Sequence, residues 1–152
     1  MENQEDNKLA IPSYRKSLEP QRAEALFNAI VKQLKKSNHY RNSEYTMEHL
    51  AKDLNVKKKY ITASVLNCTG ENYKALINHM RMRDVKRMMR TEKCQHMTIE
   101  DIALLAGYTS RQSFYTTFQR IFGTSPAAYR KLLPNFDTEA ETSSSEVRSL
   151  SN

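Results

Sequence analysis

The sequence predicts an all-α protein with two helix–turn–helix subdomains, joined by a long linker helix and preceded by an extra N-terminal helix. Apolar residues recur at helical spacing through the middle of the chain, and no segment alternates as a strand would. The three glycines, Gly70, Gly107 and Gly123, each follow such a helical pattern. The pattern itself is also repeated, because residues 46–70 resemble residues 98–123.

The first predicted helix covers residues 20–36 and starts near Pro20, a residue that favours the first helical position. A second, short helix, MEHLAKDL, is predicted to begin after Thr46 as its N-cap and to stop at Asn55. The first helix has apolar residues at helical spacing, which predicts that this face packs on the core. These residues are Leu26, Phe27, Ile30, Val31 and Leu34.

The next predicted helix covers residues 58–68, with Tyr60, Ile61 and Val65 inward and Gly70 closing it. A long helix over residues 72–91 follows, with apolar residues at Tyr73, Leu76, Ile77, Met80, Val85, Met88 and Met89. We interpret the methionine pairs Met80/Met82 and Met88/Met89 as core filling, with a partner-binding methionine surface as the alternative.

The second unit repeats the first. The short helices correspond at an offset of 52 residues and the helices after the turn at 53, so one extra residue stands in the second turn. Duplication of one helix–turn–helix unit is the economical explanation, and a chance match of small and apolar positions is the alternative. The matched pairs are Thr46/Thr98, Leu50/Ile102, Ala51/Ala103, Leu54/Ala106, Ile61/Phe114, Val65/Phe118 and Gly70/Gly123.

The second helix of the repeated unit, over residues 111–122, has two distinct faces. Ser110 is predicted to cap it, Gly123 to end it, and Ser125 with Pro126 to start another helix. One face is apolar, with Phe114, Phe118, Ile121 and Phe122. The opposite face is expected to be rich in hydrogen-bond donors and free of acids, with Arg111, Gln112, Tyr115, Thr116 and Gln119.

Charge divides the chain into a basic body with acidic ends. Residues 20–133 hold 20 basic and 9 acidic residues, a net charge of +11. We expect a flexible arm (1–19), a first unit with its linker helix (20–91), a second unit (92–133) and a disordered acidic, serine-rich tail (134–152). Such a body suggests a polyanionic partner, although a well-solvated basic surface explains the charge equally well.

Other classes of protein find less support. Cys68 and Cys94 stand alone and the four histidines are scattered, which favours reduced thiols in a cytoplasmic protein over a disulfide or zinc site. We find no catalytic grouping and no phosphate-binding glycine loop, so we expect neither an enzyme nor a cofactor or small-molecule ligand. The N-terminus is polar and acidic, and no apolar run is long enough to cross a membrane.

The stretch IEDIALLAGYTSRQSFYTTFQRIFGTSPAAYR resembles the C-terminal signature of the AraC/XylS family of bacterial transcription regulators. YTMEHLAKDLNVKKKYITASVLNCTGENYKALINHMRMRDVKRMM resembles the family's first unit and linker helix. The preceding helix with HYRNSEYTMEHLA resembles the form seen in Bacteroidetes members. The resemblance implies double-stranded DNA as the partner, with RNA polymerase or a regulatory protein as a further candidate.

Carried onto this chain, the resemblance implies that both recognition helices contact DNA. The candidate residues are Lys57, Lys58, Lys59, Thr62, Ala63, Ser110, Arg111, Gln112, Tyr115, Thr116 and Gln119. Three of them depart from the family pattern: Ala63 and Thr116 stand where an arginine is usual, and Lys57 stands where a capping serine is usual. The lysine run at 57–59 is interpreted as a phosphate anchor, with a solvated turn as the alternative.

We therefore expect a sequence-specific DNA-binding regulator that places its two recognition helices in successive major grooves. A helix of roughly 20 residues rises about 30 Å, close to the roughly 34 Å repeat of B-DNA. The alternative is a helix–turn–helix module that binds protein, with weak or non-specific DNA binding. RNA binding ranks third, since Tyr115 is the only clear aromatic expected on the surface.

Overall fold

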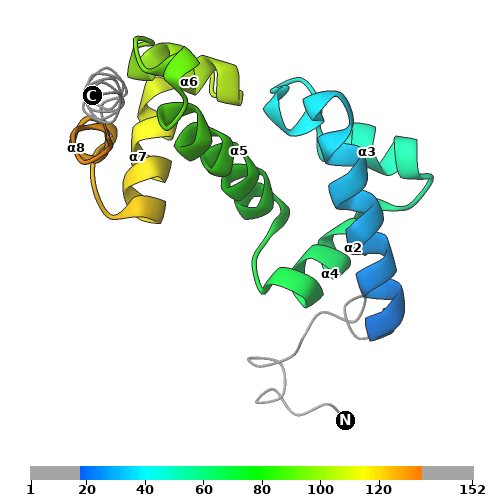
Figure 1. Cartoon of the computed structure of the whole chain (residues 1–152). Helices are drawn as coiled ribbons and strands as arrows, with labels where there is room; N and C mark the ends of the chain where they lie inside the picture. The colour runs from blue at the N-terminus through cyan, green and yellow to red at the C-terminus, as the bar shows by residue number, and fades with distance from the viewer. Residues whose placement is uncertain (1–17, 135–152) are drawn as a thin grey trace, which may run out of the picture. The chain divides into compact units, whose positions relative to one another are not determined.

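The computed structural model describes residues 18–134, and the expected arm and tail lie outside this range. The described part of the chain is helical and contains no strand, as predicted (Figure 1). Its elements are α2 (Pro20–Lys35), η1 (Lys36–Arg41), α3 (Met47–Leu54), α4 (Lys58–Thr69), α5 (Tyr73–Met89), η2 (Glu92–Cys94), α6 (Ile99–Ala106), α7 (Arg111–Phe122) and α8 (Pro126–Lys131). None of the helices within 18–134 is long and apolar enough to cross a membrane.

The helices end and begin at the residues that the sequence predicted as caps. Asn55 closes α3 with φ 52°, and Gly70, Gly107 and Gly123 close α4, α6 and α7 with φ of 73°, 107° and 73°. These are left-handed conformations, which glycine and asparagine adopt at little cost. Ser110 accepts a hydrogen bond from the Ser113 N–H at 3.2 Å, so the predicted serine cap of α7 is confirmed.

The start of α3 is held by a histidine as well as by the predicted cap residue. The backbone N–H of Thr46 donates to Nδ1 of His49 at 3.1 Å, and the Thr46 hydroxyl lies 2.8 Å from the same nitrogen. The imidazole therefore occupies the third helical position, where a Glu or Gln side chain usually reaches back to the cap.

The first compact unit ends at Met80, within α5. In this unit α2 packs on α3 and most extensively on α4 (Figure 1). The Ser64 hydroxyl of α4 donates to the Ala23 carbonyl of α2 at 2.6 Å, and both residues are buried. Tyr40, which no predicted stripe included, is buried in this core, whereas Leu26, Phe27 and Val31 of the predicted stripe are only partly buried. The buried residues of the core are Ile30, Leu34, Tyr40, Leu50, Ala51, Ile61, Val65 and Met80.

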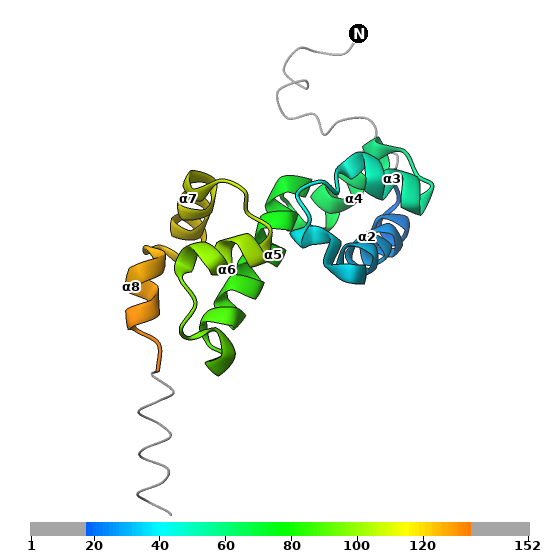
Figure 2. The ribbon, with the colours of Figure 1, turned by 90° about the horizontal axis from the view of Figure 1, so that it is seen from above.

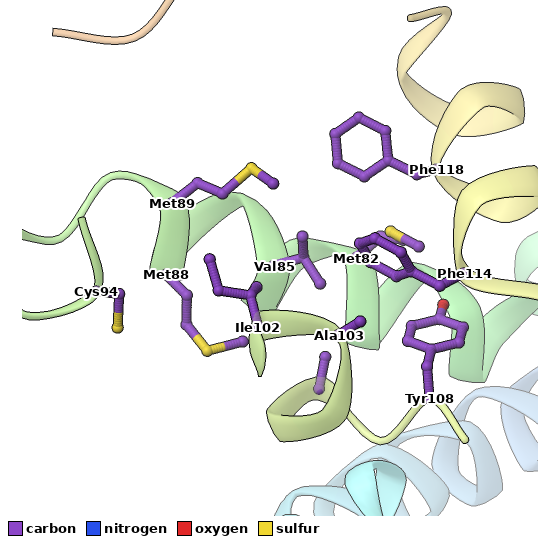
Figure 3. Packing of buried hydrophobic residues seen from close by; sticks show 11 residues of the cluster. Met82, Val85, Met88, Met89, Cys94, Ile102, Ala103, Tyr108, Phe114 and Phe118 are labelled. Carbon is purple, nitrogen blue, oxygen red and sulfur yellow. The ribbon is translucent and has the colours of Figure 1, made fainter. Parts of the chain in front are cut away.

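The second compact unit begins at Arg81, so the later half of α5 belongs to it. Figure 2 shows α6, α7 and α8 gathered about this half-helix. In Figure 3 the methionines of α5 point toward Ile102 and Ala103 of α6 and toward the rings of Tyr108, Phe114 and Phe118. The interpretation of the methionine pairs as core filling is confirmed, since Met80, Met82, Met88 and Met89 are all buried.

Aromatic rings and one arginine attach α8 to the rest of the second unit. Tyr129 packs edge-on against Phe118, with ring centroids 5.7 Å apart, and stacks on Phe122 at 5.5 Å. The Arg130 guanidinium donates to the carbonyls of Cys94 and Gln95 at 3.1 and 2.8 Å. Phe122 packs against the core through this contact with Tyr129 and remains partly exposed. Phe114 and Phe118 are fully buried.

Candidate nucleic-acid interface

Helix α7 sorts its side chains as its sequence pattern predicts. Phe114, Thr117 and Phe118 are buried, which orients the opposite face outward. That face carries donors and acceptors that suit base edges and phosphates. Its exposed members are Arg111, Gln112, Thr116 and Gln119, beside the exposed cap Ser110.

Arg111 begins this helix and is held by two neighbours. Its guanidinium nitrogen Nη2 lies 3.6 Å from Oε1 of Glu100, and its Cζ lies 5.2 Å from the centre of the Tyr115 ring. The Tyr115 hydroxyl donates to the same Glu100 oxygen at 3.1 Å. Arg111, Tyr115 and Glu100 thus form one network at the start of α7.

This network corrects two expectations. The recognition face is not free of acids, because Glu100 of α6 brings a carboxylate to it. The residues of α7 alone do not reveal this, since the tight turn brings the first turn of the preceding helix to the same place. Tyr115, expected to be exposed, is half-buried because it packs on the Phe114 ring with centroids 5.5 Å apart.

A shallow pocket of about 190 Å³ lies beside the network, between α6 and α7. Polar groups of Glu100, Ser110 and Arg111 lie at this pocket together with apolar groups of Leu104 and Phe114. Leu104 is 65% exposed and Leu105 is 51% exposed. The second unit therefore presents an apolar patch on α6 next to the polar start of α7.

Helix α4 presents its three lysines at its own start, and all three are exposed. Lys57 is the N-cap residue and makes no capping bond through its side chain. The Lys58 ammonium lies 2.7 Å from Oε1 of Glu48, and the Lys59 ammonium lies 5.1 Å from the centre of the Tyr60 ring. Hydrogen bonding from Lys58 is the main reason that the pKa of Glu48 falls to about 2.

Ala63, a candidate DNA contact by its place in the family pattern, does not lie on the exposed surface of α4. Its exposed fraction is 0%, so its methyl group is unable to meet a thymine methyl. The neighbouring Ser64 of α4 donates to the Ala23 carbonyl of α2, and α2 and α4 pack together. Thr62 is half-buried, and its hydroxyl contacts Sδ of Met47 at 3.8 Å.

The remaining chemistry-bearing residues form no further site in the described part of the chain. Cys68 and Cys94 are free thiols, the first exposed and the second buried. Within residues 18–134 no group of three or more His, Cys, Asp or Glu side chains is placed to hold a metal ion. His49 caps α3, and His79 pairs with Glu71 at 2.9 Å.

Comparison with known proteins identifies the family. The sequence model of an AraC-type family described as "Helix-turn-helix domain" matches residues 50–132, more than half of the chain. The chain belongs to this family. The match begins within α3 and ends just after α8, so it includes both α4 and α7.

Two curated relatives are named as operon regulators. The Msm operon regulatory protein of Streptococcus mutans is 28% identical over 108 residues, 70% of this chain and 38% of the relative. The melibiose operon regulatory protein of Escherichia coli K12 is 35% identical over 91 residues, 57% of this chain and 28% of the relative. The chain thus spans between a quarter and two fifths of these relatives.

Solved structures show the same fold. The C-terminal domain of AraT, a response regulator from Geobacillus stearothermophilus, matches with a TM-score of 0.60 and 27% identity over 70% of this chain and 88% of that one. The C-terminal domain of the response regulator yesN from Fusobacterium nucleatum matches with a TM-score of 0.60 and 21% identity, over 70% and 98% of the two chains.

Proposed function

We propose that this chain is a sequence-specific DNA-binding transcription regulator in which α4 and α7 each enter a major groove. The observation that carries the proposal is the outward face of α7, which exposes Arg111, Gln112, Thr116 and Gln119 while Phe114 and Phe118 hold the helix on its core. The net charge of +11 over residues 20–133 supplies attraction to the phosphates. Membership of an AraC-type helix–turn–helix family supports the same conclusion.

The two recognition helices would contribute different contacts. Arg111 suits a bidentate contact with guanine and Gln112 one with adenine, since each side chain matches the edge of that base. Lys57, Lys58 and Lys59 suit phosphates, because an ammonium is a point charge without a preferred plane. Helix α5 has 17 residues and rises about 25 Å, less than the roughly 30 Å expected from the sequence.

Selection of bound sequences from a random DNA pool tests this function. The expected result is a single enriched motif with two half-sites, bound at least about a thousandfold more tightly than random DNA in mobility shifts at physiological salt. A shift at low salt without any enriched motif would reduce the activity to non-specific binding. No shift at either of two salt concentrations would reject DNA binding for this chain.

The second candidate function is a protein-interaction module with weak DNA binding. Two observations favour it: Ala63 is buried in α4, and Leu104 and Leu105 are exposed on α6. Such a patch fits RNA polymerase or a regulatory protein as partner. Replacing both leucines by Ser should leave DNA affinity unchanged and, if the patch binds a polymerase, abolish promoter activation in a reconstituted transcription assay with purified polymerase.

A further inference from the structure

The two units carry the same acid–base pair at equivalent positions. Glu48 and Glu100 are the second residues of α3 and α6 and lie 52 positions apart. Lys58 and Arg111 are the first residues of α4 and α7 and lie 53 positions apart. In each unit the acid reaches across the turn to the cation, at 2.7 Å in the first unit and 3.6 Å in the second.

The second pair has additional support that the first pair lacks. Tyr115 donates to Glu100 at 3.1 Å, and its ring lies under the Arg111 guanidinium, with 5.2 Å from Cζ to the ring centre. The equivalent position in the first unit is Thr62, whose hydroxyl contacts Met47 at 3.8 Å. Arg111 is therefore held from two directions, whereas the Lys58 ammonium is held by the Glu48 carboxylate.

We propose that Glu100 is a positioning residue that determines specificity by holding Arg111 for a base edge. The proposal rests on the DNA binding proposed above. A guanidinium has five N–H donors in a planar fork, so the contact with Glu100 leaves donors for a second, bidentate partner. The Arg111 side chain is 74% exposed, which leaves it open to such a partner.

Glu100 should therefore affect the two kinds of DNA complex differently. At a matched site Arg111 keeps its contacts with Glu100 and Tyr115 and donates to the base. On random DNA Arg111 stays paired with Glu100 and makes no phosphate contact, because reaching a phosphate would break this pair and leave the freed carboxylate near the negatively charged backbone. Lys58 has no planar preference, so Glu48 should weaken matched and random complexes equally.

The test replaces Glu100 by Gln, which keeps the shape and can still accept the Tyr115 hydroxyl but removes the charge. Asp101→Asn is the matched control, because it makes the same charge change one residue later on α6, where no contact with Arg111 is found among the described residues. Glu48→Gln tests the equivalent pair. Each variant is titrated with the selected site and with random DNA at several salt concentrations, after circular dichroism has shown that it is folded.

We expect Glu100→Gln to raise affinity for random DNA about two- to fivefold, the range of one exposed ion pair, and to leave the selected site unchanged or weaker. The slope of log K against log salt on random DNA should steepen by about 0.9, because Arg111 gains a phosphate. In an Arg111→Ala background Glu100→Gln should behave like Asp101→Asn. Glu48→Gln should raise both affinities by one common factor.

Two results would overturn the inference alone. The first is an equal gain in affinity of Glu100→Gln for the selected site and for random DNA. The second is that Glu100→Gln and Asp101→Asn show the same ratio of specific to random affinity. A parent chain that binds neither DNA overturns the proposed function and this inference together. A parent chain that discriminates between the DNAs keeps the function, so the behaviour of Glu100→Gln then decides the inference.

Discussion

The two helix–turn–helix units share one frame but differ at the positions that face outward. In α7 Thr116 is exposed, whereas its counterpart Ala63 in α4 is fully buried. Ser110 caps α7 through its hydroxyl, whereas Lys57 holds the same place in α4 and makes no capping bond with its side chain. The two units thus share a pattern of helices but present different surfaces.

The physical cause of this difference lies in what packs on each recognition helix. In the first unit α2 packs along α4, and Ser64 bonds to the Ala23 carbonyl there. In the second unit α7 packs on α6 and α8. We therefore expect the two units to make different contacts with DNA: the second unit contacts base edges, and the first contacts mainly phosphates.

The cores of the two units differ as well, and the largest predicted effect tests that difference. Phe118→Ala should lower the free energy of unfolding by about 3–5 kcal/mol, since the ring is fully buried. Its counterpart Val65→Ala removes far less volume and should cost about 2 kcal/mol. Urea denaturation measures both, with Thr116→Ala, expected within about 0.5 kcal/mol of the parent, as the exposed control. A decrease below about 1 kcal/mol for Phe118→Ala would contradict its place in the core.

Arginine at the two counterpart positions should separate them sharply. Ala63→Arg places a large cation in a fully buried position, so we expect a decrease of about 2–4 kcal/mol in stability. Thr116→Arg is on the surface and should change stability by less than about 0.5 kcal/mol. Thermal and urea unfolding measure the effect. Equal tolerance of both substitutions would show that Ala63 is accessible after all.

Removal of the Arg111 side chain should affect sequence-specific binding in particular. Arg111→Ala should weaken the best DNA site by about 1–3 kcal/mol, the worth of one bidentate base contact, and leave random DNA nearly unaffected. Titration of both DNAs by fluorescence anisotropy gives the two affinities. Equal weakening of binding to both DNAs would make Arg111 a phosphate contact. The contacts of α7 would then be of the same kind as those expected for α4.

The lysines of α4 should show the opposite behaviour. Replacing Lys57, Lys58 and Lys59 by Ala should weaken matched and random sites alike and lower the slope of log K against log salt by about 1–3, with about 0.9 for each phosphate that is no longer neutralised. Replacing the exposed Lys32, Lys35 and Lys36 by Ala makes the same change in charge at the end of α2 and serves as the control. An unchanged salt slope in the first variant would show that this end of α4 does not meet DNA.

The smallest effect concerns the ion pair of the first unit. Glu48 has a pKa lowered from 4.5 to about 2, chiefly by its bond with Lys58. A lowered pKa stabilises the folded state above about pH 4.5, and this contribution is lost as pH falls through about 2. Lys58→Ala should return the pKa of Glu48 toward 4.5 in an NMR titration, whereas Lys59→Ala should leave it low. If neither variant changes the pKa of Glu48, the Lys58–Glu48 ion pair at 2.7 Å is absent in solution.

Much of the fold could be predicted from local signals in the sequence. Helical periodicity located α2 to α7 within a few residues, because a buried stripe requires apolar side chains at that spacing. For α8 only the start was predicted, from Ser125 and Pro126. Left-handed helix ends at Asn55, Gly107 and Gly123 were predictable because few other residues tolerate that backbone. The residues of α7 that face outward followed from the same periodicity, since Phe114 and Phe118 define the inward side.

Only the tertiary structure decided which outward positions are open and which charges meet. Ala63 has the same helical phase as the exposed Thr116, yet it is fully buried, and α4, unlike α7, packs on a helix distant in sequence. Glu48 and Glu100 were not predicted as partners of Lys58 and Arg111, because each pair spans a turn and its geometry depends on how two helices cross. Periodicity describes one helix at a time, whereas burial and ion pairing depend on the neighbour that a helix acquires when the chain folds.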